Sequence, residues 1–281
     1  MKNEKLVWVT GASGFLGSEI VEHFKKAGYT VAGTDSELSV TEPERLEAFA
    51  EELQPAVIVN CAGIRREMTG LDNRAKAYEV NALGAKNVAL AANAIGATIV
   101  QVSSDDVYAS QLNGPVNEFD SPDPNSPYGK SKRAGEMMVR NTTPDHLIIR
   151  SSWLYHAQGG RFKALLEAAK AGQKYEARND QVAAPTSVLL YMNLLIRAIE
   201  KGLHGTFHMV SRGSATRYEF GAKILEYAGY DPADILVPTT DPATAENVVL
   251  ESMLAEIAGV EMPTWEDDLK AYMKDEGLLA E

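Results

Sequence analysis

Three side chains in this sequence have the types and spacing of a site that reduces a carbonyl group. Tyr128 and Lys132 are four residues apart in a helical pattern, which places both side chains on one face. An ammonium group lowers the pKa of a neighbouring phenol, so we expect Tyr128 to donate a proton to a carbonyl oxygen. Ser104, at the end of a predicted strand, could donate a hydrogen bond to the same oxygen. Because a Tyr-x-x-x-Lys spacing also arises by chance, this interpretation depends on the surrounding elements.

A glycine-rich turn near the start of the chain predicts a dinucleotide site. Residues 6–10 are an apolar, β-branched run typical of a buried strand, and a helical pattern begins at Phe15. Gly11, Gly14 and Gly17 lie between them at three-residue spacing. Without Cβ atoms the backbone can turn tightly and approach a pyrophosphate, to which the helix N-terminus offers free N–H groups. The alternative is an ordinary turn between a strand and a helix.

An acidic residue follows the second predicted strand, residues 30–33. Asp35 lies roughly 20 residues past the glycines, where a carboxylate accepts hydrogen bonds from the adenosine ribose hydroxyls. It would repel a 2′-phosphate, which favours NAD(H) over NADP(H). Alternatively Asp35 is a turn or cap residue, because Ser36 and Glu37 follow it.

Strands and helices alternate along the first half of the chain. This order predicts an α/β fold, namely a Rossmann-type doubly wound parallel sheet with a smaller C-terminal substrate-binding lobe. We expect a dinucleotide-binding domain over residues 1–150, and over residues 151–281 mostly the lobe, with some segments returning to the first domain. Residues 72–95 read as one long helix, residues 105–127 as a functional loop and residues 175–186 as irregular.

Composition excludes several classes of protein. A net charge of −12 over 281 residues argues against a nucleic-acid binder. The single cysteine, Cys61, excludes an intramolecular disulfide and fits a reducing compartment. No signal peptide or membrane-spanning run is recognisable, so we expect a cytoplasmic protein. The five histidines lack the spacing of metal ligands, and we expect no metal site.

Several motifs carry a resemblance to a known family. T-G-A-S-G-F-L-G, N-C-A-G, V-N-A-L-G-A-K-N, V-S-S-D-D-V-Y and Y-G-K-S-K resemble the extended short-chain dehydrogenases/reductases. R-S-S-W-L-Y, N-D-Q-V-A-A-P-T-S and G-T-F-H are similar to stretches of dTDP-4-dehydrorhamnose reductases. The resemblance implies that Ser104, Tyr128 and Lys132 form a catalytic triad. It further implies that Tyr128 protonates the sugar O4 as hydride reaches C4 from the nicotinamide, and that Lys132 also holds the nicotinamide ribose.

The turn, the strand ends and the resemblance together give the expected contacts of the ligands. The expected cofactor-binding residues are Gly11, Ser13, Gly14, Phe15, Leu16, Gly17, Asp35, Val40, Cys61, Ala62, Gly63, Asn81, Tyr128 and Lys132. The expected substrate-binding residues are Arg65, Ser104, Asp105 and Trp153. Asn81 could hold a water or a backbone group in a proton relay. Trp153 could stack on substrate or be a core residue, and Cys61 is expected to be a small packing residue rather than a nucleophile.

Departures from the family pattern lie on the expected substrate side. Where the family has an acidic stretch after the third strand, this sequence has I-R-R-E-M. Its Arg65 and Arg66 could bind a phosphate or carboxylate, or could belong to a solvated loop. Asp106 occupies a position at which the family has an aromatic residue, and A-T-A-E-N-V-V-L stands where the family has an Arg-Pro motif.

The function expected from these features is reduction of a 4-keto deoxysugar nucleotide with NAD(H) or NADP(H). Another carbonyl compound, or an NDP-sugar epimerase or dehydratase reaction, is an alternative, as is a non-catalytic NAD(P)-binding regulatory subunit. We expect a nucleotide sugar as the small-molecule substrate, and a monomer or homodimer.

Overall fold

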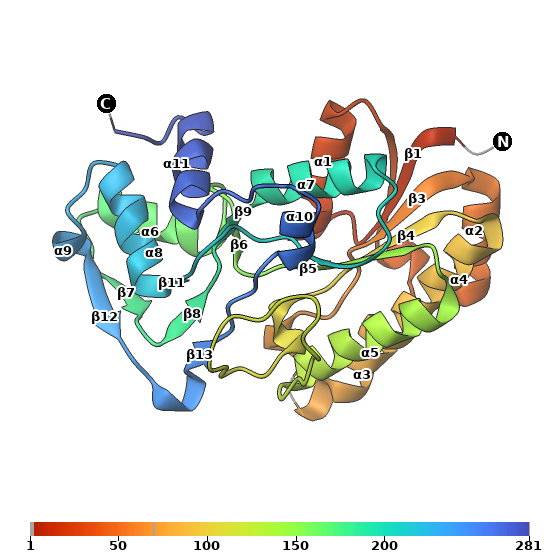
Figure 1. Ribbon diagram of the computed structural model, residues 1–281, viewed down its shortest axis with the longest axis horizontal. Helices are drawn as coiled ribbons and strands as arrows, with labels where there is room; N and C mark the ends of the chain where they lie inside the picture. Colours follow the sequence, from red (N-terminus) through yellow and green to blue (C-terminus); the bar gives the residue numbers. More distant parts are fainter. Residues whose placement is uncertain (1–2, 70, 281) are drawn as a thin grey trace. The chain divides into compact units, whose positions relative to one another are not determined.

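The computed structural model describes residues 3–69 and 71–280, and the chain divides into two compact units. The first unit comprises Met1–Tyr108, Pro122–Arg150 and Leu195–Phe207. The second comprises Ala109–Ser121, Ser151–Leu194 and His208–Glu281. Each unit is therefore built from segments that are far apart in the sequence (Figure 1).

A six-stranded sheet forms the centre of the first unit, in the order β10-β5-β4-β3-β1-β2. Its strands are β1 (Asn3–Thr10), β2 (Thr30–Thr34), β3 (Pro55–Asn60), β4 (Thr98–Val102), β5 (His146–Arg150) and β10 (Gly205–His208). The pairings from β2 through β5 are parallel. Because β1 lies between β2 and β3, the order of the strands reverses there. Ligands of such sheets bind beyond the carboxyl ends of the strands at this reversal.

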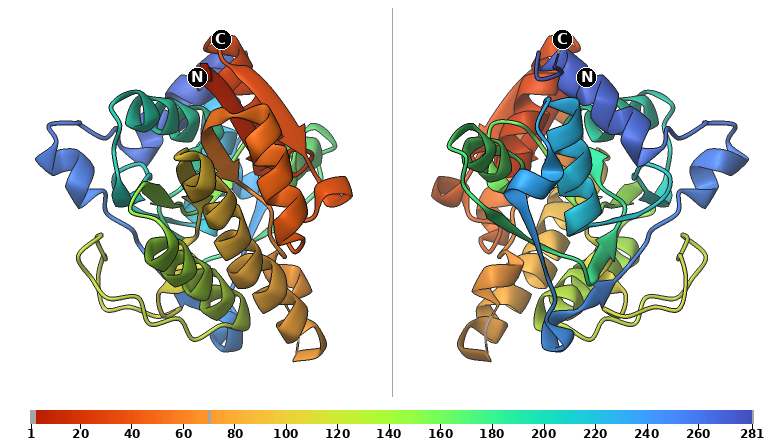
Figure 2. Two further views of the ribbon diagram at one scale, coloured as in Figure 1. Left: turned by 90° about the vertical axis from the view of Figure 1, so that its right-hand side faces the viewer. Right: turned by 90° about the vertical axis from the view of Figure 1, so that its left-hand side faces the viewer.

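Helices cover both faces of this sheet. The chain leaves β1 through α1 (Phe15–Lys26) and returns from β2 through α2 (Pro43–Leu53), and right-handed crossovers in opposite directions place these helices on opposite faces. On one face, helix α4 (Ala85–Ile95) lies beside α2, and α5 (Pro127–Thr142) lies beside α4 (Figure 2). Their apolar side chains form one buried core with the strands, which includes Trp8, Leu46, Ile58, Val88, Ile99, Val139 and Ile148.

The prediction of one long helix over residues 72–95 is wrong, because this stretch is not a continuous α-helix. A 3-10 turn (Leu71–Asn73), α3 (Arg74–Tyr78) and a π-helical turn (Glu79–Gly84) precede α4. The π turn contains Asn81, whose side chain leaves the helix to bond the backbone of Ile64. A side chain with bonds of this kind can stabilise a local departure from α-helical geometry, and such turns are frequent at functional sites.

The second unit has its own aromatic core. Helices α6 (Gly160–Lys170), α8 (Arg217–Tyr227) and α11 (Trp265–Asp275) contribute to it. Tyr155 is central, because its ring lies within 6 Å of the rings of Phe162, Phe220 and Tyr272, at 5.7, 4.9 and 5.5 Å between centroids. Among the described residues, the remaining α-helices are α7 (Val188–Glu200), α9 (Pro232–Ile235) and α10 (Met253–Ile257).

The expectation of irregular structure over residues 175–186 is wrong. This stretch contains β7 (Tyr175–Arg178), β8 (Gln181–Ala183) and the start of β9 (Thr186–Ser187). Their partners are β12 (Leu236–Thr239), β11 (Ala215–Thr216) with β13 (Glu246–Asn247), and β6 (Leu154–Tyr155). The strands were missed because each is short and is stabilised by a partner distant in the sequence.

Residues 109–121 of the predicted loop belong to the second unit. Isolated backbone bridges join Gln111 to Asn247 and Val116 to Leu250.

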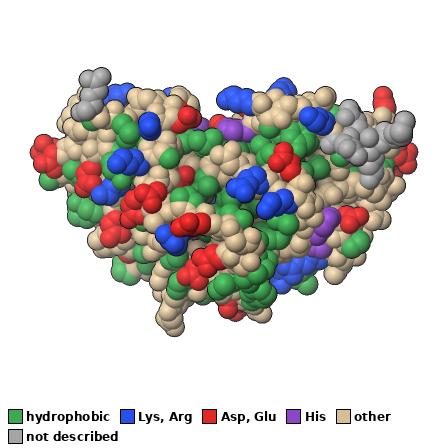
Figure 3. Space-filling model, turned by 45° about the horizontal axis from the view of Figure 1, so that its top comes forward, with side chains coloured by type: hydrophobic (Ala, Val, Ile, Leu, Met, Phe, Trp, Pro, Cys, Tyr) green, Lys and Arg blue, Asp and Glu red, His purple; other side chains and the backbone are tan. Residues whose placement is uncertain are grey.

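On the face drawn in Figure 3, Lys and Arg side chains are scattered among acidic and apolar ones. No helix within the described ranges has the length and apolar character needed to cross a membrane.

Candidate active site

A cavity of about 190 Å³ lies in the first unit, at the reversal of strand order. It is bounded by the glycine turn, the segments after β3 and β4, and the first two turns of α5. The lining residues are Gly11, Gly14, Phe15, Leu16, Gly17, Cys61, Gly63, Ile64, Arg65, Val102, Ser103, Tyr128 and Lys132. The structure thus brings together most of the residues predicted to bind the cofactor, and adds Ile64, Val102 and Ser103. The sequence held a signal for these three, because each lies at or just after the carboxyl end of a predicted strand.

The glycine turn is packed so closely that side chains are excluded from it. Gly11 has a φ of +67°, and a Cβ there would lie 2.8 Å from the amide nitrogen of Ala62. A Cβ on Gly17 would overlap the Gly11 carbonyl oxygen. Ala62 therefore lies against the turn, and this contact packs the loop after β3 against the loop after β1. This close-packed cradle, with the N-terminus of α1 beside it, fits the pyrophosphate of a dinucleotide.

The Lys132 side chain reaches across the cavity floor to β4. Its ammonium Nζ donates to the Val102 carbonyl oxygen at 2.6 Å. Burial lowers the pKa of Lys132 to about 8, although the negative charge of Glu136 acts in the opposite direction. Burial also raises the pKa of Cys61 to about 12, which keeps it a thiol and accords with a packing role.

The expected lowering of the pKa of Tyr128 is wrong for this structure, in which that pKa is raised. Burial raises the pKa of Tyr128, and the negative charges of Asp106, Asp105 and Glu67 raise it further. The ammonium acts instead on the backbone of β4. Tyr128 is consequently a neutral phenol throughout the physiological pH range, a state in which it can donate a proton.

Ser104 caps a short 3-10 turn (Asp105–Val107) that follows β4. Its Oγ donates to the Asp105 carboxylate at 2.8 Å and accepts from the Asp106 amide at 3.2 Å. The Asp106 carboxylate is 3.6 Å from the Arg66 guanidinium, whose side chain is 45% exposed. Ser104 and Asp105 are not among the described residues that line the cavity, although Ser103 is.

Asn81 holds a backbone group, one of the two alternatives considered for it. Its amide oxygen accepts from the Ile64 N–H at 2.7 Å, and its amide nitrogen donates to the Ile64 carbonyl at 3.1 Å and to Ser131 Oγ at 2.9 Å. The buried amide thereby fixes the segment after Gly63 that lines the cavity. Val40 is also buried, and its carbonyl accepts from Asn87 Nδ2 at 3.0 Å.

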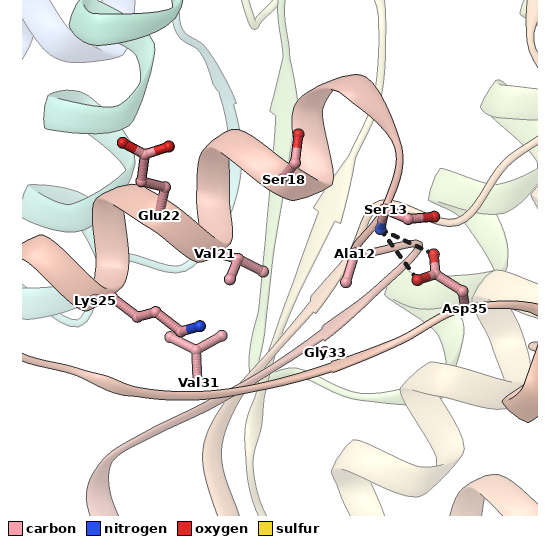
Figure 4. A pocket seen from close by; sticks show the side chains of 9 residues that line it. All are labelled: Ala12, Ser13, Ser18, Val21, Glu22, Lys25, Val31, Gly33 and Asp35. Carbon is pink, nitrogen blue, oxygen red and sulfur yellow. Dashed lines mark hydrogen bonds between the residues drawn. The ribbon is translucent and has the colours of Figure 1, made fainter.

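Asp35 and Ser13 line a second, shallower pocket of about 480 Å³ between α1 and β2 (Figure 4). Both oxygens of the Asp35 carboxylate accept from the Ser13 N–H, at 3.0 and 3.1 Å. Asp35 precedes a 3-10 turn (Ser36–Leu38), but its side chain makes no capping bond to that turn. Glu22 and Lys25 lie on the α1 wall of the pocket, on the side away from Asp35 (Figure 4). The carboxylate is thus positioned by the glycine turn.

Trp153 belongs to the second unit. Its backbone has a φ of +31°, a rare value for a residue with a Cβ. The Arg217 guanidinium carbon lies 3.2 Å from the centroid of the indole ring. Its partly buried ring stacks on a cation, which differs from ordinary core packing. Within the described part of the chain there is no group of three His, Cys, Asp or Glu side chains suited to a metal ion.

Comparison with known proteins gives a consistent result. The sequence matches the family model "RmlD substrate binding domain" over residues 5–277. It is 33% identical over 279 residues to the spore coat polysaccharide biosynthesis protein SpsK of Bacillus subtilis, which covers 96% of this chain and 97% of that protein. A crystal structure of a dTDP-4-dehydrorhamnose reductase from Clostridium acetobutylicum has a TM-score of 0.87 at 31% identity, and covers 97% of this chain and 99% of its own. That of dTDP-4-dehydrorhamnose reductase from Bacillus anthracis, in complex with NADP, has a TM-score of 0.88 at 29% identity and the same coverage, 97% and 99%.

Proposed function

This chain belongs to the RmlD substrate-binding domain family of extended short-chain dehydrogenases/reductases, and we propose that it reduces the carbonyl of a 4-keto deoxysugar nucleotide with NADH or NADPH. As a member of this family it is an NAD(P)-dependent oxidoreductase that acts on CH–OH and C=O groups. The observation that carries the proposal is the cavity in which the glycine turn, Tyr128 and Lys132 meet.

The cofactor assignment is supported by the backbone packing of the turn. Gly11 and Gly17 leave no room for a Cβ, and the Asp35 carboxylate is held against the Ser13 amide. We propose that the turn binds the pyrophosphate and that Asp35 accepts from the adenosine ribose. The relative from Bacillus anthracis was crystallised with NADP, so both nicotinamide cofactors are to be tested.

The proton chemistry is assigned to Tyr128. The bound cofactor would supply the hydride, and the carbonyl oxygen must gain a proton as its carbon is reduced. Tyr128 is kept neutral by burial and by Asp105 and Asp106, so it is an acid rather than a base in this site. Ser104 would add a second hydrogen bond to the oxygen once its hydroxyl turns away from Asp105.

Lys132 is assigned to cofactor positioning. Its buried ammonium has three N–H groups, and the Val102 carbonyl accepts from one of them. The other two could donate to the hydroxyls of the nicotinamide ribose. This role needs the ammonium form, which the pKa of about 8 preserves at neutral pH.

The substrate is the less constrained part of the proposal. The relatives named as dTDP-4-dehydrorhamnose reductases support a nucleotide-linked 4-keto sugar. Asp106 and the Arg65–Arg66 pair favour testing other anionic carbonyl compounds as well, because guanidinium groups bind phosphates and carboxylates.

The test is a binding and turnover screen. Affinities for NADH and NADPH are measured by fluorescence, and cofactor oxidation is then followed with dTDP-4-keto-6-deoxy sugar and with keto sugars lacking the nucleotide. Turnover that requires the nucleotide supports the proposal. Tight cofactor binding without turnover of any nucleotide sugar would contradict it, and copurified cofactor with no net oxidation would favour an epimerase or dehydratase.

A further inference from the structure

A fully buried carboxylate lies one helical turn beyond Lys132. Glu136 has no exposed side-chain surface, and Arg150, which is 1% exposed, donates to both of its oxygens at 2.8 Å. Arg133 donates to it at 2.9 Å. Burial works to raise the pKa of Glu136, but these guanidinium groups and the Ser103 hydroxyl hold it below its usual value. An ion pair this deeply buried is expensive to assemble and weak evidence for stability alone, so its position calls for a reason.

The ion pair holds both ends of the segment that carries Ser104. On the N-terminal side, Ser103 Oγ donates to Glu136 at 2.7 Å. On the C-terminal side, Arg150 donates from Nη1 to the Tyr108 hydroxyl at 2.8 Å. The four residues between these two contacts include Ser104 and Asp105. The same ion pair therefore fixes both the start and the end of the segment that carries Ser104.

The ion pair also lies next to the lysine of the site. Lys132 and Glu136 are on consecutive turns of α5 and hold the consecutive residues Val102 and Ser103. The negative charge of Glu136 favours the ammonium form of Lys132. Arg150 and Arg133 donate to the same carboxylate, so replacing Glu136 would also remove the anion that compensates their charge.

We propose that the buried Glu136–Arg150 pair is the positioning device of the active site, which holds the Ser103–Tyr108 segment in register with Tyr128 and Lys132. Neither residue touches the reacting groups, and both act through Ser103, Tyr108 and Lys132. The proposal rests on the function proposed above for Ser104, Tyr128 and Lys132. It predicts that loosening either end of the segment slows turnover without weakening cofactor binding.

The test uses variants that leave the ion pair intact, because removing one partner of a buried pair can prevent folding. Ser103→Ala frees the first end and Tyr108→Phe the second. We expect Ser103→Ala to lower kcat about tenfold and Tyr108→Phe about threefold, with the KM for the cofactor within about twofold of wild type. Ser103→Thr retains a hydroxyl and should restore most of the activity. Tyr191→Phe, which also removes a fully buried tyrosine hydroxyl, is the matched control and should change neither parameter.

Two further measurements make the result independent of the substrate. Amide hydrogen exchange should rise about fivefold to tenfold over Ser103–Tyr108 in the two loosened variants, and not in Tyr191→Phe. Glu136→Gln, if it folds, should shift the alkaline limb of the pH–rate profile to lower pH. An inactive wild type would overturn the proposed function while the exchange data still decide the positioning. Unchanged exchange and unchanged kcat in both loosened variants would overturn the positioning role.

Discussion

The ammonium of Lys132 is bound to the backbone carbonyl of Val102 at 2.6 Å, inside a site where the lysine is only 7% exposed. A cation in this position is poorly solvated, which is why its pKa falls to about 8. The folded protein therefore disfavours the charged form of Lys132 relative to the unfolded chain. This relationship links stability and function at one residue, since the proposed role of Lys132 requires that same charge.

Replacing Lys132 with methionine should stabilise the fold and abolish turnover. Between pH 8 and the ordinary lysine pKa of 10.5 the unfolded chain binds more protons than the folded one, so the penalty is present in full below pH 8 and disappears as pH rises through this window. After allowance for the lost bond to Val102, we expect a gain of about 1 kcal/mol at pH 7. Thermal unfolding of Lys132→Met and wild type at pH 7 and pH 10 measures this. A lower melting temperature at pH 7 would refute it.

Turnover should fall on the alkaline side as Lys132 loses its proton. With a pKa of about 8 in the free enzyme, kcat/KM is expected to decline about tenfold per pH unit above that value. Tyr128 does not produce this limb, because its pKa is raised above the normal tyrosine value of 10. The measurement is the pH dependence of kcat/KM for the cofactor at saturating substrate, which reports the free enzyme. A flat profile to pH 10 would exclude Lys132 as the titrating group.

Tyr128→Phe should remove proton donation while leaving the cofactor site intact. General acid catalysis contributes roughly 10²–10⁴ in rate, so kcat should fall by at least about a hundredfold. The affinity for NADH or NADPH should change less than about threefold, because the glycine turn and Lys132 remain. Single-turnover oxidation of bound cofactor and a fluorescence titration report the two quantities separately. Retention of more than about half of the wild-type rate would assign the proton to another group.

Gly17→Ala should disrupt the cofactor turn, and Gly114→Ala is the matched control. A Cβ at Gly17 overlaps the Gly11 carbonyl, whereas a Cβ at Gly114 meets nothing within 4 Å. We expect Gly17→Ala to weaken cofactor binding at least tenfold and to lower stability by about 1–3 kcal/mol, as overpacking does. Titration calorimetry and denaturant unfolding of both variants decide this. Equal behaviour of the two variants would show that the turn can relax around a methyl group.

The parts of the fold that the sequence predicted are those that local patterns determine. The helix expected to begin at Phe15 begins there in the structure, because the apolar period acts within the segment itself. The strands of residues 175–186 were missed because their stability comes from partners such as β12, about sixty residues away. The pattern of apolar residues within a segment does not indicate which distant strand it pairs with.

The site shows the same division between local and non-local information. The glycine spacing and the Tyr128–Lys132 spacing were readable, because one turn or one helix determines each. The partner of the Lys132 ammonium was not readable, since it is a backbone carbonyl that any residue supplies. Likewise the bonds of Asn81 to Ile64 depend on how the π turn packs against the loop after β3. Ser103, by contrast, could have been named from its place at the end of a strand.

Asp35 should set the preference between the two nicotinamide cofactors. Its carboxylate is held by the Ser13 amide at the edge of the pocket between α1 and β2, where a 2′-phosphate on the ribose would meet its negative charge. We therefore expect wild type to bind NADH more tightly than NADPH. Asp35→Asn keeps an oxygen to accept from Ser13 but removes the charge, and should improve NADPH affinity about tenfold with less than about a threefold change for NADH.

The salt dependence of cofactor affinity distinguishes this charge repulsion from a change in the shape of the pocket. If charge is responsible, raising the ionic strength should narrow the gap between NADH and NADPH in wild type and leave Asp35→Asn nearly unaffected. Fluorescence titrations of both proteins with both cofactors at low and high salt provide the four comparisons. Tighter binding of NADPH than NADH by wild type at low salt would mean that a cation elsewhere in the pocket, such as Lys25, outweighs Asp35.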